Sequence, residues 1–485
     1  MEEEKVIQVN KTNQNGQYRC PNCGSSEISP NPKTNKLKCD YCQTEFEGEP
    51  IVEQEKDLRK LTGVNRGSNT NKIDRNAEDV VTLRCGGCGA EVVIDTAHAP
   101  QARCHWCRSI LSINDKLDNG AIPDAILPFQ TKKEEARALI EGFVGKRKFF
   151  AHPKFRQEFT TENIMGVYFP YLLIDANCHA TFAGEGEHLV RTYTVGSGDD
   201  RETRYDADAY TVERDFDITM EGLSIESNSN RLDKTSNAQT NNIINSIMPF
   251  DTENCISYRG NYLVGYTSER RDVNIDELTP HVESQLKDIA RFAAKEECKF
   301  YDRGLHWDVE DLKVKGTMWI SAYLPVWLYS YQEVKGNKKT LHYVAVNART
   351  NETMGSVPIN QPLLLGISAI IEIIGTILGL FLFIVVNSAD DDSNGAFFLL
   401  LLLSGFVFYG IMYARYRNKA ARHTYEKETK KQIYDLVSKD ELKENRKGLK
   451  NSMIKDCNDS KIEGDIVDKS IFTAENLKKQ IEKIK

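Results

Sequence analysis

Hydrophobic side chains are densest in the C-terminal third of the chain. Residues 363–386 read LLLGISAIIEIIGTILGLFLFIVV, and 17 of these 24 positions are Leu, Ile, Val or Phe. As a helix this stretch would be about 36 Å long, enough to cross a hydrocarbon layer about 30 Å thick. The apolar side chains favour insertion by roughly 5 to 10 kcal/mol, whereas Glu372 opposes it by about 3 kcal/mol. The pattern therefore predicts a transmembrane helix.

A second apolar stretch, AFFLLLLLSGFVFYGIMYA at 396–414, follows after the short polar link NSADDDSNG. It is just long enough to cross a bilayer, and so short a link requires neighbouring antiparallel helices. The link contains no Lys or Arg, whereas four basic residues follow the second stretch: Arg415, Arg417, Lys419 and Arg422. Because basic flanks stay in the cytoplasm, we expect a two-span hairpin in the cell membrane with both termini cytoplasmic.

Two features inside the first stretch concern how the hairpin packs. Glu372 is an intramembrane carboxyl group and so a functional candidate by default. We favour a plainer interpretation, a protonated carboxyl hydrogen-bonded to the partner helix or to another copy. Gly375 and Gly379 form a GxxxG motif, which permits close helix approach and points to a homo-oligomer.

Between residues 121 and 360 the pattern is that of a folded soluble domain. Helical periodicity is clear at 132–146 and at 275–297. Runs rich in aromatic and β-branched residues predict strands at 210–220, 318–331 and 341–348. An α+β fold follows for this middle domain.

Two short signatures occur twice in the middle domain and in the same order. Ile126–Phe129 resembles Ile247–Phe250, and Tyr168–Leu173 resembles Tyr323–Leu328. The repetition suggests the hypothesis that the domain consists of two related halves. Residues 221–242 are rich in Asn and Ser and poor in apolar side chains, so we expect a mobile loop there.

Eight of the twelve cysteines fall into four CxxC pairs. They form two quartets with one spacing, CPNC and CDYC around fifteen residues and CGGC and CHWC around fifteen: Cys20, Cys23, Cys39 and Cys42, then Cys85, Cys88, Cys104 and Cys107. Two CxxC knuckles supply the four thiolates of a closed tetrahedral site, so we predict two structural Zn²⁺ ions. Gly24 and Gly89 allow the chain to turn. His105 is left out because four sulfurs complete the site.

Composition narrows the function further. A net charge of -8 over 485 residues argues against a protein that grips nucleic acid over a broad basic surface. The polar opening MEEEKVIQVN has no export signal, so the CxxC pairs are expected in a reducing compartment, where they bind metal. The remaining cysteines are expected to be buried or idle thiols: Cys178, Cys255, Cys298 and Cys457.

No enzyme signature stands out. The chain lacks GxxxxGK[ST], HExxH, GxSxG and a dinucleotide fingerprint. Cys178 and His179 are neighbours, and neighbours on a strand face opposite sides, so they are not expected to form a catalytic pair. We therefore expect no enzymatic activity, with an uncharacterised activity of the middle domain as the alternative.

The predicted organisation has seven parts. The tail is expected to be helical because short apolar rows recur in it, Ile433, Leu436 and Val437 and then Leu477, Ile481 and Ile484. The parts are zinc ribbon 1 at 1–48, a flexible linker at 49–80 that lets the ribbons move independently, zinc ribbon 2 at 81–116, the α+β domain at 121–360, the spans at 363–386 and 396–414, and a charged helical cytoplasmic tail at 415–485.

The double ribbon, the middle domain with its Pro-Phe and Tyr-x-Pro elements, and the late hairpin together resemble a bacterial family of membrane-anchored zinc-ribbon proteins. Such proteins carry labels taken from the transcription-factor IIB ribbon or the primosomal helicase, and no helicase motif occurs here. The resemblance implies an anchor for the phage-shock type of membrane-stress machinery, without enzymatic activity.

Two functions remain in view at this point. The leading one is a membrane scaffold that recruits a protein partner to the cytoplasmic face. The alternative is a membrane-tethered nucleic-acid binder that contacts phosphates through basic residues beside the knuckles. These are Arg19, Lys36, Lys38, Arg84, Arg103 and Arg108.

Overall fold

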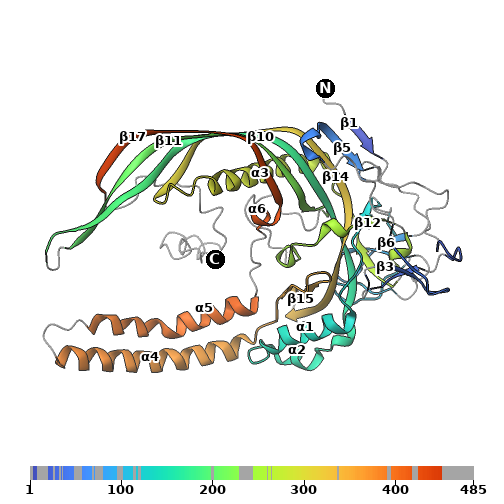
Figure 1. Cartoon of the computed structure of the whole chain (residues 1–485). Helices are drawn as coiled ribbons and strands as arrows, with labels where there is room; N and C mark the ends of the chain where they lie inside the picture. The colour runs from blue at the N-terminus through green and yellow to red at the C-terminus, as the bar shows by residue number, and fades with distance from the viewer. Residues whose placement is uncertain are drawn as a thin grey trace.

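Long antiparallel strands form the middle of the molecule (Figure 1). In the computed structural model these strands lie in the order β17, β11, β10, β14 and β15 across one sheet. Their bounds are Lys430–Leu449, Glu202–Glu226, Met165–Val195, Gly304–Lys335 and Lys338–Asn347. At about 3.3 Å per residue, β10 and β14 are each on the order of 100 Å long.

The structure describes most of the chain in separate ranges. These are residues 4–7, 20–25, 28–31, 34, 36–48, 57–67, 70, 80–95, 102–112, 116–117, 122–197, 201–228, 244–258, 260–263, 265–335, 338–389, 395–417 and 424–449. The apolar row predicted at Leu477 to Ile484, the cysteine Cys457 and Arg19 lie outside them.

Shorter elements complete the fold. The remaining strands are β1 (Glu4–Ile7), β2 (Ile28–Asn31), β3 (Lys36–Cys39), β4 (Glu45–Phe46), β5 (Gly63–Gly67), β6 (Val80–Arg84), β7 (Glu91–Asp95), β8 (Lys116–Leu117), β9 (Ala125–Ile126), β12 (Ile256–Ser257), β13 (Thr267–Glu269) and β16 (Thr353–Gly355). The helices are η1 (Leu58–Lys60), α1 (Lys133–Gly145), α2 (Pro153–Glu158), η4 (Thr161–Asn163), η6 (Asn245–Ile247), η7 (Thr252–Asn254), η8 (Gly260–Leu263), α3 (Ile275–Glu296), α4 (Gln361–Ala389), η9 (Gly395–Leu403), α5 (Ser404–Arg417) and α6 (Tyr425–Glu428). The α1 and α3 helices confirm the periodicity found in the sequence.

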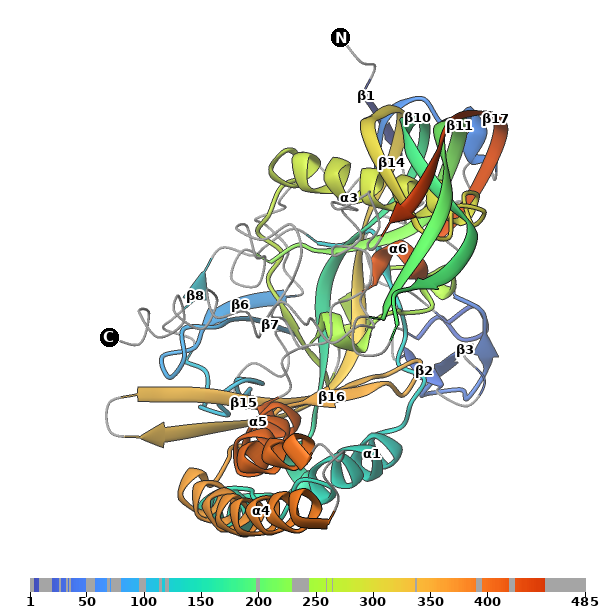
Figure 2. The ribbon, with the colours of Figure 1, turned by 90° about the vertical axis from the view of Figure 1, so that its left-hand side faces the viewer.

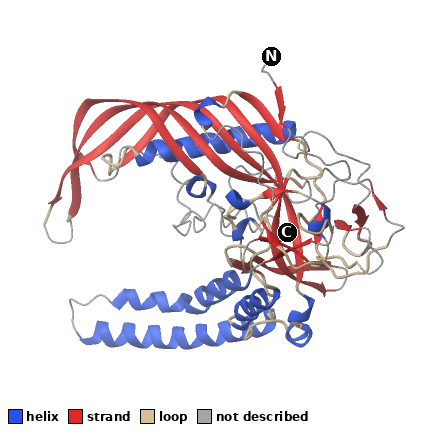
Figure 3. Ribbon diagram, turned by 45° about the vertical axis from the view of Figure 1, so that its right-hand side comes forward, coloured by secondary structure: helices blue, strands red, loops and turns tan. Residues whose placement is uncertain are grey.

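The far halves of the long strands form an arm that projects from the rest of the molecule, which we call the body (Figures 1 and 3). Alternate side chains of β10 and β11 point to one face, where the apolar stripe of α3 covers them. The stripe recurs every three or four residues: Ile275, Leu278, Val282, Leu286, Ile289, Ala290 and Ala293. The predicted strand at 210–220 lies within β11, so that prediction is confirmed.

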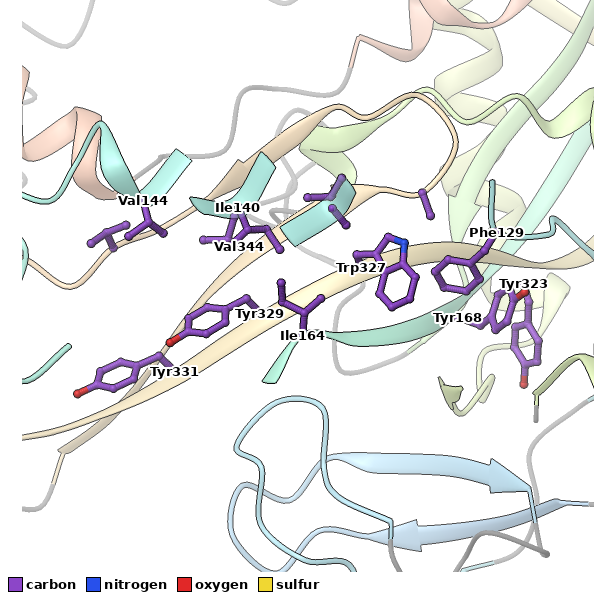
Figure 4. Packing of buried hydrophobic residues seen from close by; sticks show 14 of the residues in the cluster. Phe129, Ile140, Val144, Ile164, Tyr168, Tyr323, Trp327, Tyr329, Tyr331 and Val344 are labelled. Carbon is purple, nitrogen blue, oxygen red and sulfur yellow. The ribbon is translucent and has the colours of Figure 1, made fainter. Parts of the chain in front are cut away.

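In the body both faces of the central strands are covered. One face carries an aromatic cluster packed under α1 and the start of α4, part of which Figure 4 shows. Its labelled members include Phe129, Tyr168, Tyr323, Trp327, Tyr329 and Tyr331. The other face buries apolar side chains of the second cysteine quartet's segment, among them Leu83, Val92 and Trp106. The aromatic cluster and the second cysteine segment therefore pack on opposite faces of the same central strands.

The recurrent Tyr-x-Pro segments pair with each other. Tyr168 lies opposite Pro325, and Pro170 lies opposite Tyr323, across the antiparallel β10 and β14 ladder. Two related segments that pair in this way have the symmetry of a two-fold axis between the two strands. The sequence hypothesis of related halves predicts this relation.

The surrounding elements follow the same symmetry. β9 runs parallel to β14 and precedes α1, while β13 runs parallel to β10 and precedes α3. The two helices then pack on the long strands, α1 on β14 and β15 and α3 across β10, β11 and β14. By position, β13 is the counterpart of β9. The proposed match of Ile247–Phe250 to Ile126–Phe129 is therefore wrong, since that segment begins at the last residue of η6 and not at β13.

One helix among the described residues, Gln361–Val386 of α4, is long and apolar enough to cross a membrane. Only 11% of its most apolar stretch is buried within the protein. The second apolar stretch begins as the 3₁₀ helix η9 and continues as α5. Its apolar helical part, Leu400–Tyr416, is shorter than α4. The two run side by side as a helical hairpin (Figure 3).

Small residues line the contact between the two helices of the hairpin. A Cβ at Gly375 would lie 2.1 Å from the Ser404 hydroxyl, and one at Gly379 would lie 2.8 Å from the Phe398 carbonyl oxygen. The GxxxG motif therefore makes contacts within this chain, and the homo-oligomer stays a prediction. Glu372 Oε2 accepts a hydrogen bond of 2.7 Å from the Gly405 amide, at the first turn of α5.

Three boundary predictions need correction. The predicted tether between the ribbons contains β5, which pairs in parallel with both β14 and β1. The expected loop at 221–242 begins as strand up to Glu226, and residues 229–242 lie outside the described part. The charged tail predicted as helix forms β17 over Lys430–Leu449. The edge of β11 has backbone amides and carbonyls that need partners. The segment forms a strand that pairs with this edge, although its apolar spacing is helix-like.

Arg446 should determine how firmly β17 is held. Its guanidinium lies 2.7 Å from the carboxylate of Glu187, whose side chain is 0% exposed, and 3.2 Å from Glu185. Arg446→Ala removes the cation that this buried carboxylate pairs with, at a cost on the order of 3 kcal/mol. Amide hydrogen exchange in β17 should then accelerate by about a hundredfold.

Lys439→Ala is the matched control for Arg446. Lys439 pairs with Glu213 at 3.7 Å, and both side chains are more than half exposed. An exposed pair contributes less than about 1 kcal/mol, so exchange should change little. Equal exchange in the two variants would show that the buried pair does not hold the strand.

Candidate metal centres

The first cysteine quartet is assembled by two knuckles on either side of a small sheet. Cys20 and Cys23 precede β2, whereas Cys39 is the last residue of β3 and Cys42 follows it. The Sγ atoms of Cys20 and Cys42 lie 3.5 Å apart, and those of Cys23 and Cys39 lie 3.6 Å apart. All four sulfurs lie within 4.8 Å of one another.

The second quartet has the same geometry. Sγ distances are 3.3 Å between Cys85 and Cys107 and 3.6 Å between Cys88 and Cys104, and again all four sulfurs lie within 4.8 Å. A tetrahedral zinc ion with Zn–S bonds of about 2.3 Å requires sulfurs about 3.8 Å apart. Both donor sets therefore fit a tetrahedral metal ion, and four thiolates suit zinc.

All four knuckles share one backbone conformation. In each, the residue after the second cysteine has positive φ: Gly24 (75°), Gln43 (61°), Gly89 (80°) and Arg108 (62°). Its amide donates to the carbonyl oxygen of the first cysteine, as from Gly24 to Cys20 at 2.9 Å and from Gly89 to Cys85 at 2.8 Å. The predicted role of both glycines is confirmed, and the positive φ at Gln43 and Arg108 was not evident from residue type.

Hydrogen bonds prepare the sulfurs for a cation. Hydrogen bonds with the Thr44 hydroxyl and with its backbone lower the pKa of Cys42 to about 6. In the second quartet, a hydrogen bond from the Cys104 thiol lowers the pKa of Cys88 to about 5. A lowered pKa favours the thiolate form of these two cysteines, which is the form that binds a metal ion.

The first centre is presented to solvent. Its strands β2, β3 and β4 form a separate three-stranded sheet that makes no ladder with the large one. Ile28 and Leu37 on its inner side join the aromatic cluster of the body. On its outer side the Tyr41 side chain, within the CDYC knuckle, is 77% exposed. The first ribbon thus displays its knuckles.

The second centre belongs to the core. Its hairpin of β6 and β7 joins the large sheet through β13, and Figure 2 shows it on the opposite side of the body from β2 and β3. His105 and Trp106, within the CHWC knuckle, are 1% and 3% exposed. The expectation that the two ribbons move independently is therefore wrong for the second one.

Glu269 fastens the second knuckle to β13. Its buried carboxylate accepts a hydrogen bond of 2.6 Å from the Trp106 indole and lies 3.4 Å from His105 Nε2. The Ser330 hydroxyl donates to the His105 carbonyl oxygen at 2.6 Å. His105 thus supports the knuckle from behind and is absent from the cysteine cluster. Sequence reasoning missed Glu269 because it is distant in the chain and carries no motif.

The basic residues beside the knuckles are mostly engaged within the protein. Lys36 pairs with Glu47 at 3.6 Å and Arg84 with Glu91 at 3.6 Å. The Arg108 guanidinium lies over the Tyr329 ring, 4.5 Å from its centre. Among the described residues, those of the first ribbon and those of the second lie on opposite sides of the body (Figure 2).

The scattered cysteines within the described ranges are buried. Burial raises the pKa of Cys178 and of Cys255 to about 12 and that of Cys298 to about 11, which keeps them as thiols. His179 points away from Cys178, with its Nδ1 2.8 Å from Asp217. The two neighbours face opposite sides of β10, as predicted.

Comparisons with known proteins add one relative. The chain is similar to the uncharacterized protein YdjG of Bacillus subtilis (strain 168), with 21% identity over 350 residues that cover 71% of this chain and 90% of YdjG. No protein-family model and no solved structure matches the chain. The description of YdjG names no activity or partner, so the function is argued from the residues themselves.

The different settings of the two centres predict different costs of losing a metal. Cys85→Ser should remove one of two bound zinc ions and also lower the unfolding temperature of the detergent-solubilised protein, because β6 and β7 belong to the main sheet. Cys20→Ser should remove one zinc ion and leave the main unfolding transition in place. Zinc content and thermal unfolding, measured on both variants, provide the check. Equal thermal effects would contradict the distinction.

Proposed function

We propose that this protein is a membrane-anchored zinc-ribbon scaffold that recruits a protein partner to the cytoplasmic face of the cell membrane. The observation that carries the proposal is the exposed apolar surface of α4, joined directly to a body that displays one cysteine centre. Side chains such as Ile377 and Phe381 are more than 60% exposed, so lipid is their natural cover. The family resemblance of the sequence favours a role in membrane stress.

The geometry of the second helix supports a two-span anchor. A 3₁₀ helix rises about 2 Å per residue, so the nine residues of η9 extend about 18 Å and the fourteen of α5 about 21 Å. Together they exceed a hydrocarbon layer of about 30 Å. The 3₁₀ start therefore compensates for the shorter apolar sequence.

The two ends of the hairpin meet at one place in the body. The Phe150 amide donates to the Tyr416 hydroxyl at 3.0 Å, and its carbonyl oxygen accepts from the Asn360 amide at 2.7 Å. The Val357 amide donates to the Tyr416 carbonyl oxygen at 3.1 Å. A chain that leaves and re-enters the body at the same point would cross a membrane an even number of times, so we expect the body and β17 on one side.

Insertion also constrains the arm. The arm and the hairpin project in the same direction (Figure 1), and the outer strand β17 is dense in Lys and Glu. Charged strands do not enter hydrocarbon. In a bilayer the hairpin must therefore diverge from the arm more than it does in Figure 1. The bulges of β10 at Ile174/Ala176 and Asn177/Cys178 are where the sheet can change direction.

The first ribbon is the proposed recruiting surface. Its exposed knuckle residues combine an aromatic side chain, Tyr41, with the acidic Asp40, both in the CDYC knuckle. Exposed tyrosines are typical of protein interfaces, whereas acidic neighbours repel phosphates. The second ribbon, with its knuckle packed into the core, serves instead to hold the sheet.

Cysteine labelling tests the two-span anchor. In intact cells, Ser393→Cys in the link between the spans should react with an impermeant maleimide added outside. Ser438→Cys, on an exposed position of β17, should react only after permeabilisation. Wild-type cells measure the background from the native cysteines. Labelling of Ser438→Cys in intact cells would mean a single crossing, and labelling of neither would contradict the anchor.

Tyr41→Ala tests the recruiting surface. Protein purified from membranes in mild detergent should lose its specific partner, with roughly a tenfold or greater drop in recovery because exposed interface tyrosines often contribute 2 kcal/mol or more. Zinc content should not change. Ile110→Ala is the matched control, since Ile110 is 68% exposed on the second ribbon. Recovery of nucleic acid that disappears on nuclease treatment would favour the alternative nucleic-acid binder.

A further inference from the structure

The segment between α1 and α2 lies against the base of the hairpin (Figure 1). From Gly142 to Gln157 it reads GFVGKRKFFAHPKFRQ, with five Lys or Arg and no Asp or Glu. Arg147 Nε donates to the Arg415 carbonyl oxygen at 3.0 Å. The His152 amide donates to the Pro358 carbonyl oxygen at 2.8 Å. A basic segment distant in sequence is thereby fixed at the point where the helices leave the body.

Two adjacent phenylalanines show which part of the hairpin this segment lies beside. Phe150 is 3% exposed, and its ring centre lies 6.1 Å from that of Phe408 and 6.0 Å from that of Tyr416. Those two residues of α5 are eight apart, about 12 Å along the axis. The Phe149 ring packs edge-on against Phe150, with ring centres 4.8 Å apart, and its side chain is 65% exposed. An exposed aromatic side chain therefore sits beside the last turns of the apolar helix.

The base of α5 carries the residues typical of a membrane interface. Tyr409 and Tyr413, both half-buried, stack with their ring centres 5.7 Å apart. Tyrosines collect at the headgroup level, where an apolar ring and a polar hydroxyl are both satisfied. Arg415 is exposed among them. The tyrosines at the base of α5 and the basic segment therefore lie at the same height along the hairpin.

Most of the cations at this level lack acidic partners among the described residues. Among the described residues, no carboxylate forms an ion pair with Lys146, Arg147, Lys148, Arg156 or Arg415, while Lys154 pairs with Glu158 at 3.7 Å. The Arg147 guanidinium lies over the Phe143 ring. Burial and the positive charge of Arg415 lower the pKa of Arg147. The positive potential is therefore left for an external anion.

We propose that these side chains form a collar that binds anionic phospholipid headgroups around the base of the hairpin. The collar consists of Lys146, Lys148, Phe149, Lys154, Arg156 and Arg415. Its cations contact lipid phosphates, and Phe149 enters the boundary between headgroups and acyl chains. The inference rests on the proposed membrane anchor and adds a preference for anionic lipid to it.

Native mass spectrometry of the full chain in mild detergent measures this preference. Phosphatidylglycerol should be retained over phosphatidylcholine. The double variant Lys146→Gln/Lys148→Gln should lose about thirtyfold in phosphatidylglycerol affinity, at about fivefold per lysine. Phe149→Ala should weaken binding without changing its dependence on salt, since no charge is removed.

Lys299→Gln/Lys313→Gln is the matched control, because both lysines are exposed and lie outside the body–hairpin contact. It should retain wild-type lipid binding. Soluble glycerol 3-phosphate should not displace the lipid. Equal loss in both double variants, or full displacement by glycerol 3-phosphate, would overturn the collar.

Carbonate extraction of the same proteins separates the collar from the anchor. If wild-type protein is released from membranes by carbonate, the anchor itself fails. If wild-type protein stays in the membrane but the collar variant keeps its phosphatidylglycerol preference, the collar alone fails. Unchanged zinc content in each variant shows that the body has folded.

Discussion

The antiparallel pairing of β10 with β14 is the interaction on which the rest of this structure depends. Within the body, these strands form the layer between the aromatic cluster under α1 and the apolar face of the second ribbon. Further along, the same two strands carry α3 and the arm. Because each strand crosses both regions, the arm and the body cannot fold as separate units. The two Tyr-x-Pro segments pair with each other within the β10 and β14 ladder, and this pairing fixes the register of the two strands in the arm and in the body.

The two cysteine centres illustrate how tertiary setting divides the roles of identical local structures. Their knuckles share hydrogen bonds, backbone angles and sulfur distances. Their surroundings differ, because β7 pairs with β13 while the first ribbon keeps its own sheet. A metal ion in the second centre would stabilise the main sheet, and one in the first would shape an exposed surface. The repeated motif therefore does not imply repeated function.

The hairpin is integrated with the body more closely than a simple membrane tether would be. Its base shares the aromatic cluster with α1 through Leu364 and Tyr416, and the α1–α2 segment reaches along α5 as far as Phe408. Within the hairpin, Glu372 satisfies an amide at the start of α5, where the 3₁₀ helix changes to an α-helix. The Glu372 carboxyl thus bonds to the neighbouring helix, which is the contact that the plainer interpretation of the sequence expected.

Local patterns in the sequence were enough to identify both cysteine quartets, the apolar helix α4, and the helices α1 and α3. In each case the information lies within neighbouring residues: knuckle spacing, helical periodicity, or a continuous apolar run. Tertiary structure decided what depends on distant partners. The tail became β17 because β11 offers an open edge, and the second ribbon became part of the core because Glu269 and β13 receive it. Strand pairing and burial depend on contacts between segments that are distant in the sequence, so the residues of one segment do not predict them.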